Sequence, residues 1–285
     1  MPPTFKANQD QSDYWSSASG QKWITHEDRL DHLLSGVLDT VIERAAPAQD
    51  EHVLDIGCGT GASALRLSAL AGPRGHVTAA DIAAPLLDRA RDRATAAGLT
   101  NTTFLLADAQ THAFPPNAAD LVFSRFGVMF FNDPITAMTN LRRAVRPGGR
   151  LAFICWNSLP ENPWFHIPWK AAVARLGRPS DMDPHAPGPM AFRDIDRVTG
   201  ILRSAGWHTA QGEKIEVPLT PVGMPDDAAA LMIRVGPAAR IMNEFSATDE
   251  DARAIETVCK EALQAYQSQD GLRIPSNLIL YTARN

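Results

Sequence analysis

The stretch VLDIGCGTG, residues 53–61, decides the fold of this chain. Its first four residues predict a buried strand, its glycines a tight turn, and the residues from Thr60 onward a helix. Because glycine has no Cβ, the backbone of such a turn can approach a bound ligand closely. The free N–H groups and the positive dipole end of the helix then point at that ligand. The stretch therefore predicts a ligand site between the first strand and the first helix of an α/β sheet.

The glycine spacing and the acid that precedes it narrow the choice of ligand. A dinucleotide site has the pattern G-x-G-x-x-G, with a phosphate against the helix N-terminus. Here Gly57, Gly59 and Gly61 follow the tighter pattern G-x-G-x-G, and Asp55 precedes them by two residues. A carboxylate at that point repels a pyrophosphate and attracts a cation. A nucleoside that carries an ammonium and a sulfonium, as S-adenosylmethionine (SAM) does, suits this pattern better.

The composition favours a globular, cytoplasmic protein. The chain has 285 residues, of which 45% are hydrophobic, and a net charge of −5. There is no run of basic residues to predict a nucleic-acid partner. No apolar stretch has the length of a membrane span, and the N-terminus lacks the apolar core of a signal peptide. The three cysteines, Cys58, Cys155 and Cys259, lie far apart, which predicts neither a disulfide framework nor a metal site.

Strands and helices alternate between residues 51 and 155, which predicts a parallel sheet with right-handed crossovers. The expected strands are 53–56, 76–81, 103–107, 120–124 and 150–155. The expected helices are 60–71, 86–97 and 134–145, the last two with a proline at or next to the first helical position. Further strands are expected at 214–219 and 279–282.

The flanking segments are expected to cover this core. We divide the chain into an N-terminal cap (1–26), a SAM-binding core (27–156), an acceptor-side loop rich in proline (157–193) and a C-terminal part (194–285). The cap has aromatic residues but little helical pattern, so we expect it to order over the ligand. Residues 27–46 are expected to form one helix. A helical insertion is expected at about 222–270. Within it, the apolar run 228–242 fits a lid, a dimer face or ordinary core.

The order of these motifs resembles that of the class I SAM-dependent methyltransferases, and in particular the type 11 branch with the ubiquinone/menaquinone C-methyltransferases. The resemblance rests on residues 53–61, on Asp81 after the second strand, on Asp108-Ala109, on 120–134 and on 141–153. It implies an α/β, Rossmann-like mixed sheet of seven strands in the order 3-2-1-4-5-7-6, with strand 7 antiparallel, helices on both faces and a helical lid insertion. It also implies methyl transfer from SAM, with S-adenosylhomocysteine as the product.

Cofactor-binding residues are expected at the carboxyl ends of the strands. Asp55 would bind the SAM ammonium, and Asp81 both ribose hydroxyls. The resemblance implies that Asp108 binds the adenine amino group. For each of these candidate residues, the simpler alternative is a structural role in a turn, a helix cap or the core. The expected cofactor set is Asp55, Gly57, Cys58, Gly59, Gly61, Asp81, Ile82, Asp108, Ala109, Ser124, Trp15 and Trp23.

Aromatic residues gather outside the SAM-binding core, since no tryptophan falls within 24–155. An aromatic rim suits a small apolar or aromatic acceptor, or an amine held by cation–π contacts. Each ring can instead serve only to join the cap to the core, and Arg125 can instead pair with a nearby acid such as Asp108. The residues expected to bind the acceptor are Arg125, Phe126, Met129, Phe130, Trp156, Trp164 and Phe192.

Methyl transfer is an in-line displacement at the carbon on sulfur, so alignment and exclusion of water supply much of the rate. A base is needed only where the accepting O, N or C atom carries a proton that must leave first. His166, His185 and Tyr14 are weak candidates for that base, and each is also explained as a packing or surface residue.

Two other functions compete with methyl transfer to a small molecule. A nicotinamide-dependent oxidoreductase is disfavoured by Asp55 and by the missing G-x-x-G spacing. A non-catalytic SAM-binding protein on the same fold stays open, because fold does not fix function. The identity of the acceptor and the oligomeric state, including a homodimer, are also open.

Overall fold

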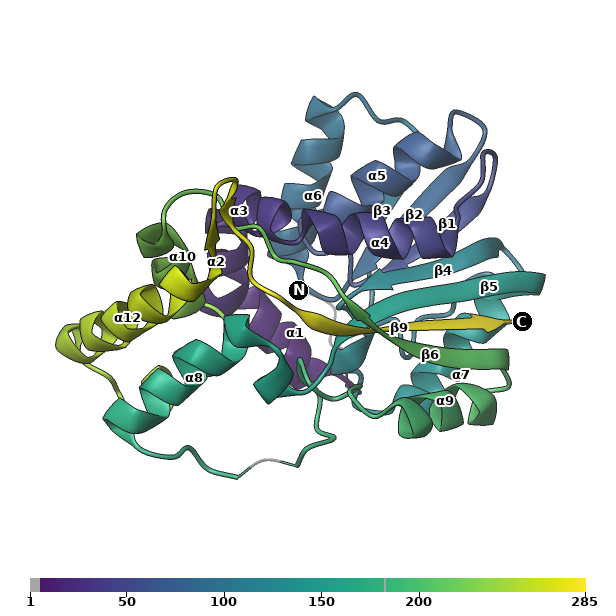
Figure 1. Ribbon diagram of the computed structural model, residues 1–285. Helices are drawn as coiled ribbons and strands as arrows, with labels where there is room; N and C mark the ends of the chain where they lie inside the picture. The colour runs from purple at the N-terminus through teal and green to yellow at the C-terminus, as the bar shows by residue number, and fades with distance from the viewer. Residues whose placement is uncertain (1–5, 182) are drawn as a thin grey trace.

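The protein is described here by a computed structural model that covers residues 6–181 and 183–285 (Figure 1). Its main sheet has seven strands in the order β3-β2-β1-β4-β5-β9-β6. Only β9 is reversed, and it pairs antiparallel with both β5 and β6. This order and the reversed strand confirm the expected fold. The strands are β1 (His52–Ile56), β2 (His76–Asp81), β3 (Thr102–Leu106), β4 (Ala119–Arg125), β5 (Val145–Trp156), β6 (His208–Glu216) and β9 (Asn277–Arg284).

Helices cover both faces of this sheet (Figure 1). One face carries α4 (Ser35–Ala45), α5 (Ala62–Ala71) and α6 (Ala84–Ala96). The other carries α7 (Pro134–Ala144) and α9 (Ile195–Ser204). The Asp133 side chain caps α7 by accepting a hydrogen bond from the Thr136 N–H.

A second group of helices lies beyond one end of the sheet (Figure 1). The β9 arrow points away from this group, so the other strands, which run opposite to β9, have their carboxyl ends toward it. The helical group therefore covers the edge where ligands of open α/β sheets bind. Its members are α1 (Gln9–Ser16), α2 (Ala18–Thr25), α3 (Glu27–Leu33), α8 (Pro163–Leu176), α10 (Pro225–Met232), α11 (Pro237–Glu244) and α12 (Asp249–Leu263).

Short elements complete the chain. They are the 3-10 turns η1 (Val128–Phe130), η2 (Leu159–Glu161) and η3 (Gln264–Tyr266), and a small hairpin of β7 (Gln267–Ser268) and β8 (Gly271–Leu272). No helix within the described ranges is both long enough and apolar enough to pass through a lipid bilayer.

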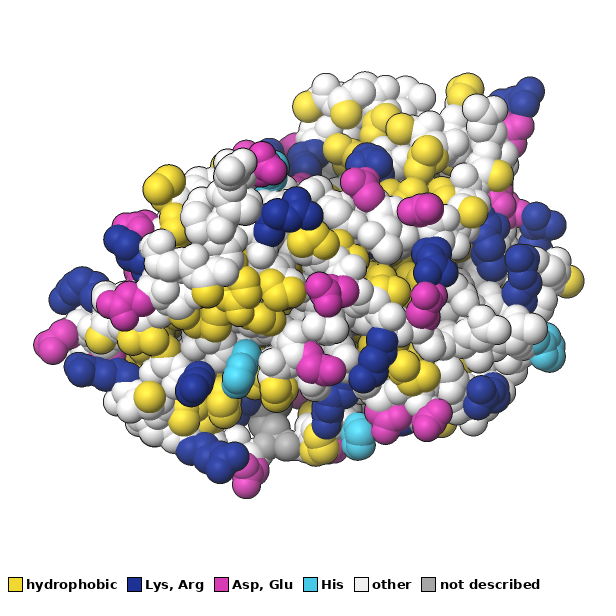
Figure 2. All heavy atoms as spheres, viewed as in Figure 1, with side chains coloured by type: hydrophobic (Ala, Val, Ile, Leu, Met, Phe, Trp, Pro, Cys, Tyr) yellow, Lys and Arg dark blue, Asp and Glu magenta, His cyan; other side chains and the backbone are white. Residues whose placement is uncertain are grey.

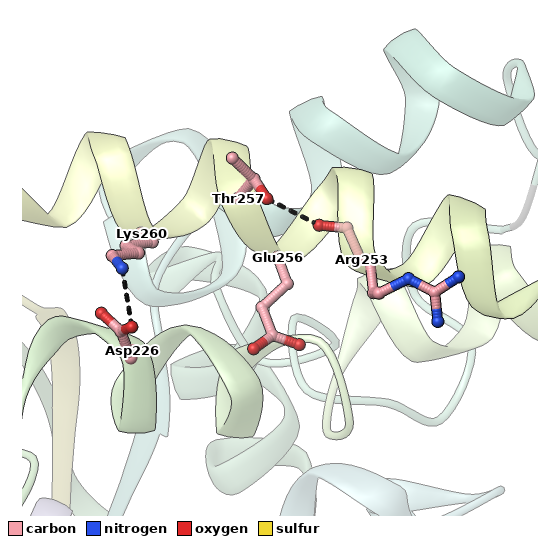
Figure 3. A pocket seen from close by; sticks show the side chains of 5 residues that line it. All are labelled: Asp226, Arg253, Glu256, Thr257 and Lys260. Carbon is pink, nitrogen blue, oxygen red and sulfur yellow. Dashed lines mark hydrogen bonds and ion pairs between the residues drawn. The ribbon is translucent and has the colours of Figure 1, made fainter.

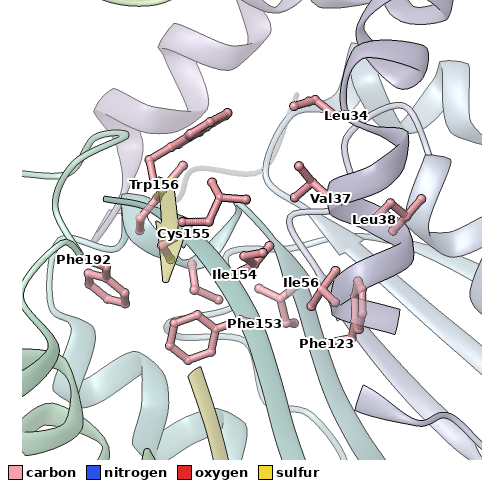
Figure 4. Packing of buried hydrophobic residues seen from close by; sticks show 14 of the residues in the cluster. Leu34, Val37, Leu38, Ile56, Phe123, Phe153, Ile154, Cys155, Trp156 and Phe192 are labelled. Carbon is pink, nitrogen blue, oxygen red and sulfur yellow. The ribbon is translucent and has the colours of Figure 1, made fainter. Parts of the chain in front are cut away.

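The core fixes the positions of the strand ends. Figure 4 shows Leu34, Val37 and Leu38 on one side of the central strands, the side on which Ile154 is buried. On the opposite face Phe153 packs on Tyr281 and Phe192, with ring centroids 4.9 and 6.1 Å apart. Strands clamped on both faces present their last residues in a rigid row.

Four segments differ from the expectation. The cap forms two short helices, α1 and α2, and the proline-rich segment 157–193 contains the helix α8. Pro163 stands at the first helical position, where no N–H is needed, so the many prolines around it concealed a helix start. The helix expected at 27–46 is divided at Leu34 into α3 and α4.

The strand expected at 214–219 is β6, which begins at His208 and ends at Glu216. It is the edge strand of the sheet and mostly exposed, and its residues 208–213 lack the alternation of apolar and polar residues that indicated a strand from Lys214 onward.

Candidate functional site

The turn after β1 packs directly on the turn after β4. Gly57 has a φ of 68°, and a Cβ there would lie 2.6 Å from the Cα of Gly127. A Cβ on Gly127 would lie 2.5 Å from the carbonyl oxygen of Ile56. The Ser124 hydroxyl joins the two turns, because it donates to the Ile56 carbonyl at 2.7 Å and accepts from the Gly127 N–H at 3.1 Å. Gly57 and Ser124 therefore have structural roles here, which they share with Gly127.

Gly59 is the glycine of the turn that borders open space. Its φ is 56°, and a Cβ on it would meet no atom within 4 Å. Gly61 instead precedes α5, and a Cβ there would lie 3.0 Å from the Cβ of Ala90. Cys58 is buried, and desolvation raises the pKa of its thiol well above the usual range. The part of the turn that a ligand can approach without displacing protein atoms is thus around Gly59.

Asp81, the last residue of β2, holds the glycine turn from the other side. Its Oδ2 accepts a hydrogen bond from the Gly59 N–H at 2.8 Å, and its Oδ1 accepts one from the Ala83 N–H at 2.9 Å. Each oxygen retains a second lone pair, which is what two ribose hydroxyls require. Ile82 beside it is half-buried, and its carbonyl accepts a hydrogen bond from the Ser12 hydroxyl of α1 at 3.4 Å.

Asp108, which follows β3, is bound by the N-terminal cap. The Asn8 amide nitrogen donates to both carboxylate oxygens, at 2.9 and 3.0 Å, and to Gln110 Oε1 at 3.1 Å. The Asn8 amide oxygen accepts from the Asn132 N–H at 2.8 Å. Ala109 is buried next to this group. The sequence did not single out Asn8, because its partners lie about a hundred positions away and leave no local pattern.

Asp55 and Arg125 lie on the same face of the sheet. Asp55 pairs with Phe123 in the parallel ladder of β1 and β4, and Arg125 is two residues further along β4. Asp55 is fully buried; its Oδ2 accepts from the Ser63 hydroxyl at 2.6 Å, and its Oδ1 has no hydrogen-bond partner. Desolvation raises the pKa of Asp55 to about 7, although Ser63 and the positive charge of Arg125 oppose the rise.

Acidic residues of α3 connect Arg125 to the rest of the site. Arg125 Nη2 lies 3.8 Å from Asp31 Oδ1, while Arg125 Nη1 is buried without a partner. Asp31 Oδ2 also pairs with Arg93 Nη2 at 2.7 Å, and Arg93 Nη1 donates to the carbonyl of Thr60 at 2.9 Å. Glu27, almost fully buried, pairs with Arg89 of α6. These pairs hold α3 against α6, the glycine turn and the end of β4.

Aromatic side chains form two contact groups near this edge. Phe126 stacks on Trp156 with ring centroids 4.5 Å apart, and Phe165 meets Trp156 edge-on at 4.7 Å. Trp15 of the cap meets Phe130 at 5.3 Å and Trp23 at 5.9 Å. Three other residues expected to bind the acceptor are buried in the core, namely Met129, Trp164 and Phe192.

The three candidates for a general base differ in their surroundings. His166 of α8 is half-buried beside Trp169, with ring centroids 6.1 Å apart. His185 is exposed, and Tyr14 is 53% exposed on the outer side of Trp15. Among residues 6–181 and 183–285 no cluster of His, Cys, Asp or Glu has the composition of a metal site.

Two surface hollows have only small polar linings. One is bordered by Thr25, His26, Asp28 and Arg29. The other lies between α10 and α12, where Lys260 pairs with Asp226 at 2.6 Å (Figure 3). Figure 2 shows positive and negative side chains interspersed over this face of the molecule. Neither hollow includes a residue from the strand ends, so the carboxyl edge of the sheet remains the candidate site.

Comparison with known proteins matches residues 53–149 to the methyltransferase domain family. Aklanonic acid methyltransferase from Streptomyces sp. (strain C5) is 36% identical over 113 residues, 40% of this chain and 51% of that protein. A ubiquinone/menaquinone biosynthesis C-methyltransferase from Pseudomonas syringae pv. tomato is 37% identical over 130 residues, 44% of this chain and 51% of that protein. The chain therefore spans about half the length of these curated relatives.

Solved structures share the fold over a larger part of the chain. Phosphoethanolamine N-methyltransferase 2 from Haemonchus contortus, in complex with SAM, superposes with a TM-score of 0.61 at 15% identity, over 96% of this chain and 59% of that one. The [4+2]-cyclase SpnF superposes with a TM-score of 0.51 at 19% identity, over 87% of this chain and 80% of that one. At such low identity these likenesses concern the fold alone, and the two proteins differ in reaction.

Proposed function

We propose that this chain, which has the fold of the class I SAM-dependent methyltransferases and a methyltransferase domain at residues 53–149, transfers a methyl group from SAM to a small acceptor. One observation carries the proposal. The open glycine Gly59 and the two acids Asp81 and Asp108 meet at the carboxyl edge of adjacent strands, beneath the N-terminal cap. A nucleoside needs one hydrogen-bond acceptor for its ribose and another for its base. Asp81 at the end of β2 is placed for the ribose, and Asp108 after the neighbouring β3 is placed for the base.

The residues divide the cofactor between them. Asp81 takes the ribose hydroxyls while its backbone bonds keep the carboxylate in place. Asp108 takes the adenine amino group, with Ile82 against the adenine ring. Asn8 of the N-terminal cap donates to the same carboxylate, so in this proposal Asp108 contacts both the adenine ring system and the cap. SAM supplies the sulfonium leaving group, and the protein has to align the acceptor and exclude water.

The acceptor side favours a planar, largely apolar small molecule. The parallel stack of Phe126 on Trp156 offers a flat aromatic wall at the ends of β4 and β5. Two relatives are named for small-molecule chemistry, one as an aklanonic acid methyltransferase and the other as a C-methyltransferase of ubiquinone/menaquinone biosynthesis. Where the acceptor atom carries a proton, His166 is the best placed base, because the other two candidates are exposed.

Release of the bound ligand tests the cofactor. The purified protein is extracted with cold acid, and the released molecules are identified by mass spectrometry. We expect SAM or S-adenosylhomocysteine from the native protein and neither from Asp81→Ala. The control is Asp88→Ala on the exposed side of α6, which should retain the ligand. If the extract is empty, calorimetric titration with S-adenosylhomocysteine decides, and release of NAD would overturn the proposal.

Methyl transfer is tested separately, since the cyclase shows that this fold serves other reactions. The protein is incubated with methyl-labelled SAM and a panel of aromatic acids, hydroxyquinones and amines. Label in a product, in the native protein and the Asp88→Ala control but not in Asp81→Ala, supports the transferase. Tight SAM binding without transfer to any member of the panel, or to compounds from a cell extract, would favour the non-catalytic alternative.

A further inference from the structure

The turn that follows β5, residues 157–162, carries a buried amide without a partner. Asn157 is 3% exposed, and its Nδ2 atom has no hydrogen-bond partner among residues 6–181 and 183–285. A buried N–H group that gains no hydrogen bond on folding costs free energy. Native structures contain few such groups, and a ligand that supplies the missing partner is one reason to retain them.

Two other asparagines show that this turn is well bonded apart from that amide. Asn162 Nδ2 donates to the carbonyl oxygens of Ser158 and Asn277, both at 3.0 Å, and its Oδ1 accepts from the Asn277 N–H at 3.0 Å. Asn277 Nδ2 donates to the Glu161 carbonyl at 3.0 Å. The Asn157 N–H joins the same network, because it donates to the Asn277 carbonyl at 3.1 Å. The backbone on both sides of the unpaired amide is therefore fixed.

The place of Asn157 in the sheet assigns its side chain to the acceptor side. Asn157 directly follows Trp156, the last residue of β5, whose ring stacks on Phe126 at the end of β4. In the strand order, β4 and β1 separate β5 from β2 and β3. The acids proposed to bind the ribose and the adenine, Asp81 and Asp108, belong to those two distant strands. The edge at β5 is thus left for the acceptor.

We propose that Asn157 Nδ2 donates a hydrogen bond to an oxygen atom of the acceptor, which is a planar ring compound with a carbonyl, carboxylate or ionised hydroxyl oxygen. The inference rests on the proposed function and narrows its acceptor to oxygenated rings. An amide N–H pairs with the lone pairs of such an oxygen, whereas an ammonium group has no lone pair to offer. A ring without the oxygen leaves the buried amide unpaired, and sites built in this way discriminate strongly against such analogues.

Matched pairs of ligands test this on the unaltered protein. Indanone and indane share one ring skeleton, as do fluorenone and fluorene, and only the ketone of each pair has an oxygen. The protein is saturated with S-adenosylhomocysteine, and the Kd of each probe is measured by calorimetry. We expect a ketone to bind at least about 10-fold more tightly than its hydrocarbon. Equal affinity within the pairs, or no binding of either ketone to protein that binds S-adenosylhomocysteine, would overturn the proposal.

Asn157→Leu removes the donor and nearly preserves the shape of the side chain. The preference within each pair should then reverse, because the ketone oxygen is buried without a donor, while the Kd of S-adenosylhomocysteine stays within about twofold of the native value. The ligand-free variant should also unfold at a higher urea concentration than the native protein, because an unpaired buried amide has been removed. Asn162→Leu is the matched control, since it removes an amide that makes three hydrogen bonds and should lower the urea midpoint.

The alternatives give other patterns. If a buried water already pairs with Asn157 Nδ2 and stays in place, Asn157→Leu lowers the urea midpoint as Asn162→Leu does and leaves the ratio of ketone to hydrocarbon affinity unchanged. If the amide only holds the turn, Asn157→Leu weakens ketone and hydrocarbon by one factor. Either pattern refutes the inference and leaves the proposed function intact. Failure of the native protein to bind S-adenosylhomocysteine would refute the proposed function itself.

Discussion

Replacement of Asp55 by asparagine should remove a pH dependence from the stability of the ligand-free protein. The carboxylate is fully buried, and its pKa rises from 3.8 to about 7 through desolvation. Between those pH values the folded protein holds a proton that the unfolded chain has lost. The free energy of unfolding therefore falls as the pH rises from about 4 to about 7, and then levels off.

The size of the effect follows from the gap between the two pKa values. A gap of roughly 3 pH units corresponds to about 4 kcal/mol, at 1.36 kcal/mol for each unit. Asparagine has nearly the same shape and carries no charge at any of these pH values. Asp55→Asn should thus equal the native protein in stability near pH 4 and exceed it by a few kcal/mol at pH 8, since the other titrating groups are common to both proteins.

Urea denaturation at pH 5, 6, 7 and 8, followed by tryptophan fluorescence, measures the difference. Ser63→Ala provides a second test, because it removes the hydrogen bond that lowers the pKa of Asp55. In that variant the decline in stability should extend to higher pH. A constant difference between Asp55→Asn and the native protein over this range would show that Asp55 does not titrate there, and the reasoning would fail.

Three further outcomes are expected. Gly127→Ala should lower the free energy of unfolding by about 2 kcal/mol, because the new Cβ would meet backbone at 2.5 Å. Gly59→Ala should lower it by only about 1 kcal/mol but should weaken the binding of S-adenosylhomocysteine. Urea denaturation measures both values, and a larger loss in Gly59→Ala than in Gly127→Ala would contradict this prediction. Asn8→Ala removes the hydrogen bonds to Asp108 and should therefore speed limited proteolysis within α1 and α2. The control is Ser16→Ala at an exposed position of α1, and equal cleavage rates in the two variants would show that the Asn8 amide does not hold the cap in place. Trp156→Leu should raise the KM of the acceptor and leave the Kd of S-adenosylhomocysteine within about twofold of the native value. A loss of cofactor affinity as large as the rise in KM would show that the stacked rings do not belong to the acceptor side.

The sequence predicts the sheet and its cofactor edge because the signals there are local. An apolar run that is followed by glycines, or that ends in an acid such as Asp81, predicts both a strand and the residue at which the strand ends. The strand order follows from the resemblance and from the handedness of βαβ crossovers. Asp55, Asp81 and Asp108 were found in this way, since Asp55 lies one residue before the end of β1, Asp81 closes β2 and Asp108 follows β3.

The remaining features depend on contacts between distant segments. Gly127 is needed only because its turn meets that of Gly57, and Asn8 only because α1 lies over Asp108. Neither relation leaves a periodic pattern in the sequence. Prolines concealed α8, and residues 208–213 of β6 lack the alternation of apolar and polar residues that indicated a strand at 214–219. The unpartnered atoms of Asp55 and Arg125 become visible only when every nearby hydrogen bond is known.

The position of β9 between β5 and β6 has a consequence for biosynthesis. During translation β5 and β6 are synthesised before β9, and α10, α11 and α12 are synthesised between β6 and β9. Until β9 emerges, β5 and β6 each present an open edge to other nascent chains, and β6 has no strand to pair with. A translational pause or a premature stop before Asn277 would prolong that exposure. Codon usage and chaperone supply over residues 217–276 should therefore govern the soluble yield of the protein more than changes of the same kind within the first half of the chain.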